Sequence, residues 1–175
     1  MRWVALLRAV NLGPDNKVPM AGLRALLEGA GYGDVRTYIA SGNVLLDGRA
    51  ARGALGAELE RLVLDAFGVT TTVILRKQPE LAATVAEHPF GADPSETHVA
   101  FLAARPTRTA AARLETVDPG ADRVVLAGAN AYLRLPRGVH GSRLSIGRIE
   151  SLLGVPATLR NWRTVVALAE LAAGA

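Results

Sequence analysis

An internal repeat constrains the fold of this chain more than any other feature of its sequence. The run His98–Leu102 echoes Trp3–Leu7, and both are apolar segments of the length of a strand. The segment Ala127–Asn130 echoes Ala40–Asn43, and each lies between two further strand-like runs. Two matches in the same order predict a duplicated unit.

The first copy alternates strands and helices in the order β-α-β-β-α-β, which is that of the ferredoxin-like plait. Helical spacing of apolar residues, and glycines at the ends, predict helices over residues 19–31 and 52–67. Strands are predicted at Trp3–Arg8, Val35–Ile39, Val44–Leu46 and Val69–Ile74.

The second copy is shorter and ends in an additional helix over residues 162–173, for which Asn161 is the expected N-cap. Its predicted strands are His98–Leu102, Val124–Leu126, Tyr132–Leu135 and Ala157–Arg160, with helices at Thr109–Thr116 and Ile146–Leu153. We therefore expect an α+β protein of two ferredoxin-like halves, residues 1–77 and 97–175, joined by a helical connector over 78–96.

Composition excludes several classes of site. The 175 residues contain no cysteine, which rules out a disulfide scaffold, thiolate metal sites and thiol catalysis. The three histidines show no metal-ligand spacing, so we expect no metal and no cofactor. No apolar run approaches the roughly 20 residues of a membrane span, and Arg8 interrupts the apolar stretch of the first residues. A soluble cytoplasmic protein without membrane contact is expected.

Positive charge is concentrated at the two ends of the chain. The formal net charge is +4, divided as +3 over residues 1–77, −3 over 78–133 and +4 over 134–175. Nearly all of the basic residues are arginines, whose planar fork suits phosphate and carboxylate groups. A compositional bias of the source genome is an alternative reason for the arginines, and +4 is too modest to imply obligate nucleic-acid binding.

The copies differ most in the loop after their first strand. Trp3 and Asn43 are 40 residues apart, whereas His98 and Asn130 are 32 apart, and the loop NLGPDNKVP accounts for most of the difference. A loop longer than its duplicate, and rich in polar residues, is a place where function is expected. In a plait this loop and the following hairpin lie at one edge of the sheet, which would bring together Arg8, Asn11, Asn16 and Lys17 with Ser41, Gly42 and Asn43.

Two cations, three amides, a hydroxyl and a helix N-terminus at one edge suit an anionic ligand. Tight turns alone could also require these asparagines and glycines, so both interpretations stay open. Arg160, Asn161 and Trp162 form a second candidate set, in which an anion and a flat group could be held at a helix N-terminus. The alternative is that Trp162 is a core anchor against which Arg160 packs.

Five segments of the sequence together resemble the signature blocks of the bacterial family named domain of unknown function 1697. They are LLRAVNLG at Leu6–Gly13, NKVPM at Asn16–Met20, TYIASGNV at Thr37–Val44, HPF at His88–Phe90 and TLRNWRTV at Thr158–Val165. This chain departs from the expected pattern at Ala9–Val10 (Gly–Ile), at Ala40 (Gln) and at Arg143 (Lys). The resemblance implies an α+β architecture of two plait-like halves and no established activity.

Three functions remain open on this basis. The first is a non-catalytic module that binds a nucleotide, a phosphorylated metabolite or a nucleic acid. The second is a small cofactor-independent enzyme that acts on an anionic metabolite, with Arg8, Lys17, Asn43 and Arg160 holding charge. The third is a homodimeric interaction protein whose apolar surface, for example the alanine-rich last helix, is covered by a second copy.

Overall fold

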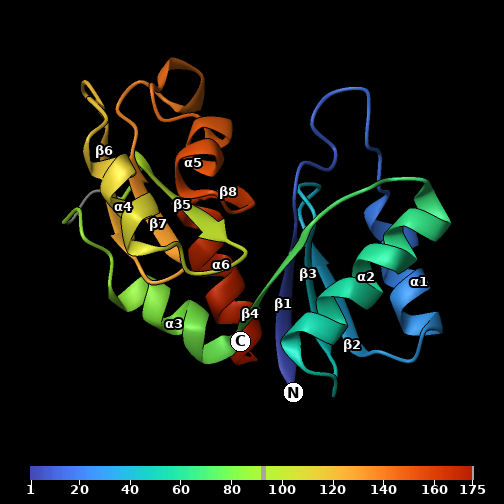
Figure 1. Ribbon diagram of the computed structural model, residues 1–175. Coiled ribbons are helices and arrows are strands. Elements are labelled where there is room, and N and C mark those ends of the chain that lie inside the picture. The colour runs from blue at the N-terminus through green and yellow to red at the C-terminus, as the bar shows by residue number, and fades with distance from the viewer. Residues whose placement is uncertain (92–93, 175) are drawn as a thin grey trace. The chain divides into compact units, whose positions relative to one another are not determined.

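Two four-stranded antiparallel sheets form the framework of the protein (Figure 1). The structure is a computed structural model and describes residues 1–91 and 94–174. Over those residues it contains six α-helices and one 3-10 turn besides the strands, so the predicted α+β class is confirmed. The chain divides into two compact units, one of Met1–Ala82 with Leu168–Ala175 and the other of Ala83–Ala167.

The first unit contains a sheet with the strand order β2-β3-β1-β4. Both neighbours of β1 run antiparallel to it. Along the chain its elements are β1 (Arg2–Leu7), α1 (Met20–Gly29), β2 (Gly33–Tyr38), β3 (Asn43–Asp47), α2 (Arg52–Phe67), β4 (Val73–Lys77) and the first part of α3 (Gln78–Ala86).

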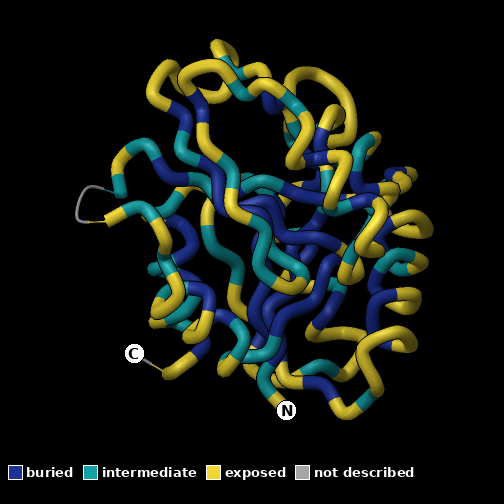
Figure 2. The backbone as a smooth tube through the Cα atoms, turned by 60° about the vertical axis from the view of Figure 1, so that its left-hand side comes forward, coloured by how far each residue is buried: buried dark blue, intermediate teal, exposed yellow. Residues whose placement is uncertain are grey.

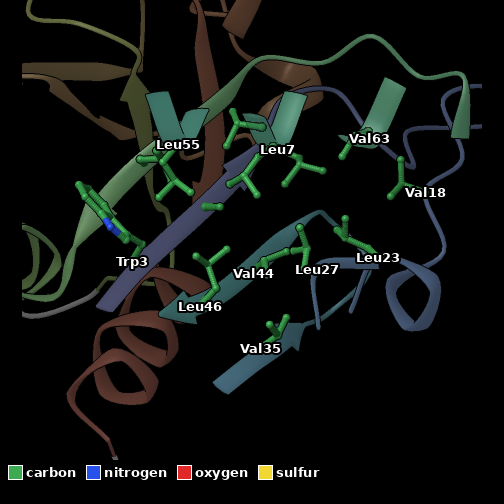
Figure 3. Close-up of a cluster of buried hydrophobic side chains, with 14 of the residues drawn as sticks. Trp3, Leu7, Val18, Leu23, Leu27, Val35, Val44, Leu46, Leu55 and Val63 are labelled. Carbon is green, nitrogen blue, oxygen red and sulfur yellow. The ribbon is translucent and has the colours of Figure 1, made fainter. Parts of the chain in front are cut away.

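Alternate side chains of these strands meet the apolar faces of α1 and α2. Figure 3 shows Leu7 and Val44 on the strands among Leu23 and Leu55 from the helices, and each of these side chains is buried. Burying a side chain of this size contributes about 1.5–3 kcal/mol. Val18, at the end of the loop that precedes α1, belongs to the same cluster and therefore anchors that loop.

The second unit contains a sheet with the strand order β6-β7-β5-β8. If the four strands of each unit are numbered along the chain, both sheets have the same spatial order: second, third, first, fourth. Its elements are β5 (Thr97–Leu102), α4 (Arg108–Glu115), β6 (Arg123–Ala127), β7 (Asn130–Arg134), a 3-10 turn (Val139–Gly141), α5 (Ile146–Leu153), β8 (Ala157–Asn161) and the first part of α6 (Trp162–Ala173). Leu114 of α4 and Ile149 of α5 pack on this sheet with Leu133.

Equivalent residues of the two units occupy equivalent positions. Asn43 pairs with Leu6 at the start of β3, and Asn130 pairs with Phe101 at the start of β7. Most residues of the central strands of both sheets are buried, while exposed residues gather in loops and on outer helix turns (Figure 2). None of the helices in the described part of the chain has the length and apolar character that crossing a bilayer requires.

The predicted position of the fourth strand is wrong. The β-branched run favoured Val69–Ile74, but β4 spans Val73–Lys77. Pairing with β1 decides this boundary, because Leu7 is the last residue of β1 and its partner is Val73. Thr71 and Thr72 instead bond the backbone of Arg8 beyond the end of β1.

Candidate functional site

The surplus loop predicted from the sequence connects β1 to α1 over residues 8–19. Its counterpart between β5 and α4 spans only residues 103–107. Four loop residues have positive φ, namely Ala9 (54°), Asn11 (57°), Gly13 (83°) and Asn16 (53°). Residues in the left-handed conformation reverse the chain direction tightly, so the loop folds back on itself. The main-chain N–H of Asn11 donates to the main-chain carbonyl of Asn16 at 3.0 Å.

The side chain of Asn11 holds the loop against the β2–β3 hairpin. Its Nδ2 donates to the carbonyls of Val18 at 2.9 Å and of Ala40 at 2.7 Å. Its Oδ1 accepts from the Val18 amide at 2.9 Å. Both amide hydrogens are therefore engaged, and Asn11 positions the loop and the hairpin relative to each other.

Gly42 brings the hairpin into direct contact with the end of β1. The Leu7 amide donates to the Gly42 carbonyl at 2.8 Å. Gly42 has φ +78°, and an added Cβ would lie 2.5 Å from Val10 Cγ2 and 2.9 Å from Leu7 Cβ. Only glycine fits both the backbone conformation and the space.

Asn43 and Ser41 shape the hairpin turn from inside. Asn43 is fully buried, and its Nδ2 donates to the Tyr38 carbonyl at 3.0 Å and to Ser41 Oγ at 2.9 Å. The turn is thus braced by side-chain bonds as well as by the strand ladder, and its shape is fixed.

The two cations of the loop lie at its opposite ends. Arg8 follows β1 and is half-buried, its amide donating to the Thr72 carbonyl at 3.0 Å, whereas Lys17 is exposed. Lys17 precedes α1, whose N-cap Pro19 makes no side-chain capping bond and whose first turn has no acidic residue. The positive end of the helix dipole is therefore not offset by a local carboxylate.

Two apolar residues at this edge were not anticipated from the sequence. Leu12 in the loop is 73% exposed and Ile39 in the hairpin is 52% exposed. Ile39 also has φ +49°, a conformation that is strained for a β-branched residue. Its position in the run Val35–Ile39 predicted a strand residue, so only the structure reveals the strain.

Ala9 carries a smaller strain that a substitution should relieve. The left-handed region costs a residue with Cβ roughly 1–2 kcal/mol, and the greater freedom of unfolded glycine offsets part of that. We expect Ala9→Gly, the residue of the family pattern, to raise the free energy of unfolding by about 0.5–1 kcal/mol, measured by urea denaturation. Unchanged or lower stability would show that Ala9 is not strained.

The other three predicted site residues are consecutive and lie in the second unit. Arg160 of β8 is 7% exposed, and its Nη1 donates to Thr158 Oγ1 and to the Leu159 carbonyl, both at 2.8 Å. Burial lowers the pKa of Arg160 to about 10, so the guanidinium remains charged at neutral pH. Asn161 Oδ1 accepts from the Thr164 amide at 2.9 Å, which is the predicted N-cap of the helix that begins at Trp162.

Trp162 packs against a histidine that sequence reasoning had not connected with it. The rings of His88 and Trp162 have centroids 4.3 Å apart, and Phe90 meets His88 edge-on at 6.0 Å. His88 Nε2 lies 3.0 Å from Thr97 Oγ1. His88 and Phe90 belong to the HPF block and Trp162 to the block at Thr158–Val165, but no spacing in the sequence indicates that these two blocks meet.

Two half-buried histidines, His88 and His98, give stability a pH dependence. Burial lowers the pKa of His88, against a bond to the Gly91 backbone, and burial likewise lowers the pKa of His98, against a bond to Glu96. The unfolded chain therefore binds protons more readily than the folded one. Their contribution is fully present above the ordinary histidine pKa of about 6.5 and is lost as pH falls through the lower folded values.

We expect the free energy of unfolding to decline between pH 7 and pH 5 (about the range in which histidine titrates), and to decline less in His88→Gln. Chemical denaturation at several pH values measures both. An identical pH profile for wild type and His88→Gln would contradict the assigned direction for His88.

Arg76 is a further buried cation that the sequence analysis did not single out. It pairs with Val4 across β1 and β4, as Arg160 pairs with Val99 across β5 and β8. Burial lowers the pKa of Arg76 to about 10, and its Nη1 donates to the preceding Leu75 carbonyl at 3.0 Å. The dipeptide Leu–Arg at the same place in both fourth strands was the available signal.

The structure places the predicted residues in two groups, one in each unit, and the bond from Asn11 to Ala40 joins the loop and the hairpin of the first unit. The first unit holds Arg8, Asn11, Asn16, Lys17, Ser41, Gly42 and Asn43 at one loop and one hairpin, and the second unit holds Arg160, Asn161 and Trp162. Within the described part of the chain, no cluster of three histidine or carboxylate side chains offers a metal site.

Comparison with known proteins decides the family. The model of the family described as "Protein of unknown function (DUF1697)" matches residues 1–132. The chain belongs to this family. Four of the five signature blocks lie inside the match, including the loop and the hairpin, and the block at Thr158–Val165 lies outside it.

A solved structure is similar to this DUF1697 chain over nearly its whole length. The conserved bacterial protein SP0830 from Streptococcus pneumoniae is similar to it with a TM-score of 0.73 at 18% sequence identity, over 98% of each chain. At this identity the likeness establishes the fold alone. None of the curated proteins matches the sequence.

Proposed function

We propose that the loop at residues 8–19 and the hairpin at residues 38–43, here called the loop–hairpin edge, bind an anionic ligand without catalysis. A nucleotide, a phosphorylated metabolite or a nucleic acid would supply the negative charge. The bonds of Asn11 to Val18 and to Ala40 carry this proposal. They hold a long polar loop in one conformation before any ligand arrives, and this reduces the entropic cost of binding.

Each residue has a distinct part in the proposed site. Arg8 and Lys17 supply charge, and the first turn of α1 offers backbone N–H groups near Lys17. Ser41 and Asn16 contribute polar groups at the rim. The remaining residues set the shape of the backbone rather than contact the ligand. The side chains of Asn11 and Asn43 already make hydrogen bonds within the protein, and neighbouring side chains fill the space beside Gly42.

Arg160, Asn161 and Trp162 are proposed as contacts for the same class of ligand in the second unit. The half-buried Trp162 ring beside His88 supplies a flat surface on which a base can stack. The buried guanidinium of Arg160, which lies two residues before Trp162 in the sequence, supplies a fixed positive charge.

We also infer that each half, residues 1–77 and 97–175, is a ferredoxin-like plait and that the halves arose by duplication, with residues 78–96 as the connector. Support comes from the β-α-β-β-α-β order of both halves and from their common strand order of second, third, first, fourth. The equivalent registers of Asn43 and Asn130 also support it.

Titration with nucleotides and short oligonucleotides at low salt tests the binding proposal. We expect wild type to bind and the double variant Arg8→Ala, Lys17→Ala to bind at least about tenfold more weakly, because each charge-assisted bond contributes about 1.5–3 kcal/mol. The variant Arg61→Ala, Arg108→Ala removes two exposed arginines elsewhere and should keep the wild-type affinity. Equal affinities of all three proteins would contradict the site.

A further inference from the structure

β6 is one of the two end strands of the sheet in the second unit, and β8 is the other. In the order β6-β7-β5-β8, no described strand pairs with the outer side of β6. Its sequence RVVLA is apolar after Arg123, and Val125 is 39% exposed. Open backbone groups on an apolar strand are a template for pairing with another chain.

The equivalent edge of the first unit is protected. β2 has the sequence GDVRTY, its register with β3 shifts between Gly33 and Arg36, and Asp34 pairs with Arg36 at 3.0 Å. Bulges and charges are the devices by which proteins prevent edge pairing. β6 has neither a register shift with β7 nor a charge after its first residue. The duplicate thus supplies a matched comparison within one chain.

The register shows which backbone groups of β6 are open. The two-residue turn Gly128–Ala129 makes its flanking residues, Ala127 and Asn130, a hydrogen-bonded pair, and such pairs alternate along the ladder. Val125 opposite Tyr132 is then the next hydrogen-bonded pair. The N–H and C=O groups of Val124 and Leu126 consequently face the open side.

A hollow lies beside this edge. Its volume is about 520 Å³, and it is lined by Ala111, Leu114 and Glu115 of α4, by Val117, Pro119 and Asp122 of the connection, and by β6 itself. Much of this lining is apolar, so covering it would remove hydrocarbon surface from water.

We infer that β6 pairs antiparallel with β6 of a second copy of this chain, about a two-fold axis at Val125. In that register Val124 of one copy bonds Leu126 of the other through the open backbone groups, and the two Val125 side chains meet. Arg123 faces Ala127 of the other copy, so no like charges oppose each other. The axis is perpendicular to the sheet, which places both α4 helices and both hollows on the same face.

A second copy fits this edge because its own β6 is equally apolar and because its single charged residue, Arg123, would face Ala127 rather than another arginine. The strand is short, so the dimer is expected to form in a concentration-dependent manner rather than permanently. This pairing is independent of the loop–hairpin edge, because it involves none of the residues of the first unit.

Sedimentation velocity of the full chain across the micromolar range tests the pairing. We expect wild type to dimerise, and Val125→Lys and Val125→Glu each to weaken dimerisation at least about tenfold, since each places like charges opposite one another. An equimolar mixture of the two variants should recover a dimer. Leu64→Lys changes an exposed apolar residue of α2 and should leave the dimer as in wild type.

A wild type that stays monomeric throughout, or Val125 variants that dimerise as wild type does, would overturn the inference. Failure of the mixed variants to pair would overturn it also, because the mixture places opposite charges at the two Val125 positions. Circular dichroism of each variant checks that it is folded, and Val125→Thr, which keeps the branched shape without charge, should retain the dimer.

Discussion

Gly42→Ala is expected to destabilise the protein by at least about 3 kcal/mol. The added Cβ would lie 2.5 Å from Val10 Cγ2 and 2.9 Å from Leu7 Cβ, and the residue must also keep φ near +78°. Either effect alone costs on the order of 1–3 kcal/mol. The hairpin would move away from the end of β1, so the midpoint of urea denaturation should fall and the loop–hairpin edge should lose its shape.

Gly13→Ala separates the two effects. Gly13 has a similar φ of +83°, but an added Cβ there meets nothing within 4 Å. This control should cost only about 1–2 kcal/mol from the left-handed conformation. If Gly42→Ala costs no more than Gly13→Ala, the close approach of hairpin and strand is not as described.

Asn11→Ala has the second largest expected effect, a loss of about 2–3 kcal/mol. Three hydrogen bonds disappear, and alanine tolerates φ +57° less well than asparagine does. Because the bond to Ala40 joins the loop to the hairpin, amide hydrogen exchange over residues 8–18 should also accelerate. If the preformed loop binds the ligand, the affinity of the Asn11→Ala variant for the ligand should fall as well.

Asn16→Ala is the matched control. Asn16 has nearly the same φ, 53°, but its side chain makes one long bond, 3.4 Å from Nδ2 to the Ala9 carbonyl. Both substitutions place alanine in the left-handed region, so the difference between them measures the Asn11 side-chain bonds. Equal destabilisation would mean that these bonds do not hold the loop.

Local patterns predicted most of the fold. The bounds of α2 and α5 follow from their apolar spacing and from Gly68 and Gly154, which end them in the left-handed conformation. The start of β4 could not be predicted in the same way. Thr71 and Thr72 favour strands, but the length of the paired strand β1, a non-local property, decides where pairing begins.

The sequence predicted which residue types the candidate site contains, but not how their side chains are bonded. Loop length and residue types indicated which segments meet at one edge. They did not indicate that the side-chain amide of Asn11 donates to the carbonyls of Val18 and Ala40, nor that Ile39 is exposed and strained. Those properties depend on tertiary bonds between distant segments, as does the contact of His88 with Trp162.

The most direct test of the proposed anion site is a map of amide chemical shifts during titration with ATP and with a short single-stranded oligonucleotide at low salt. The account predicts shifts concentrated in the loop at residues 8–19, in the first turn of α1 and in the hairpin at residues 38–43. They should be absent from the double variant Arg8→Ala, Lys17→Ala. Shifts confined to other surfaces, or none with either ligand, would contradict it.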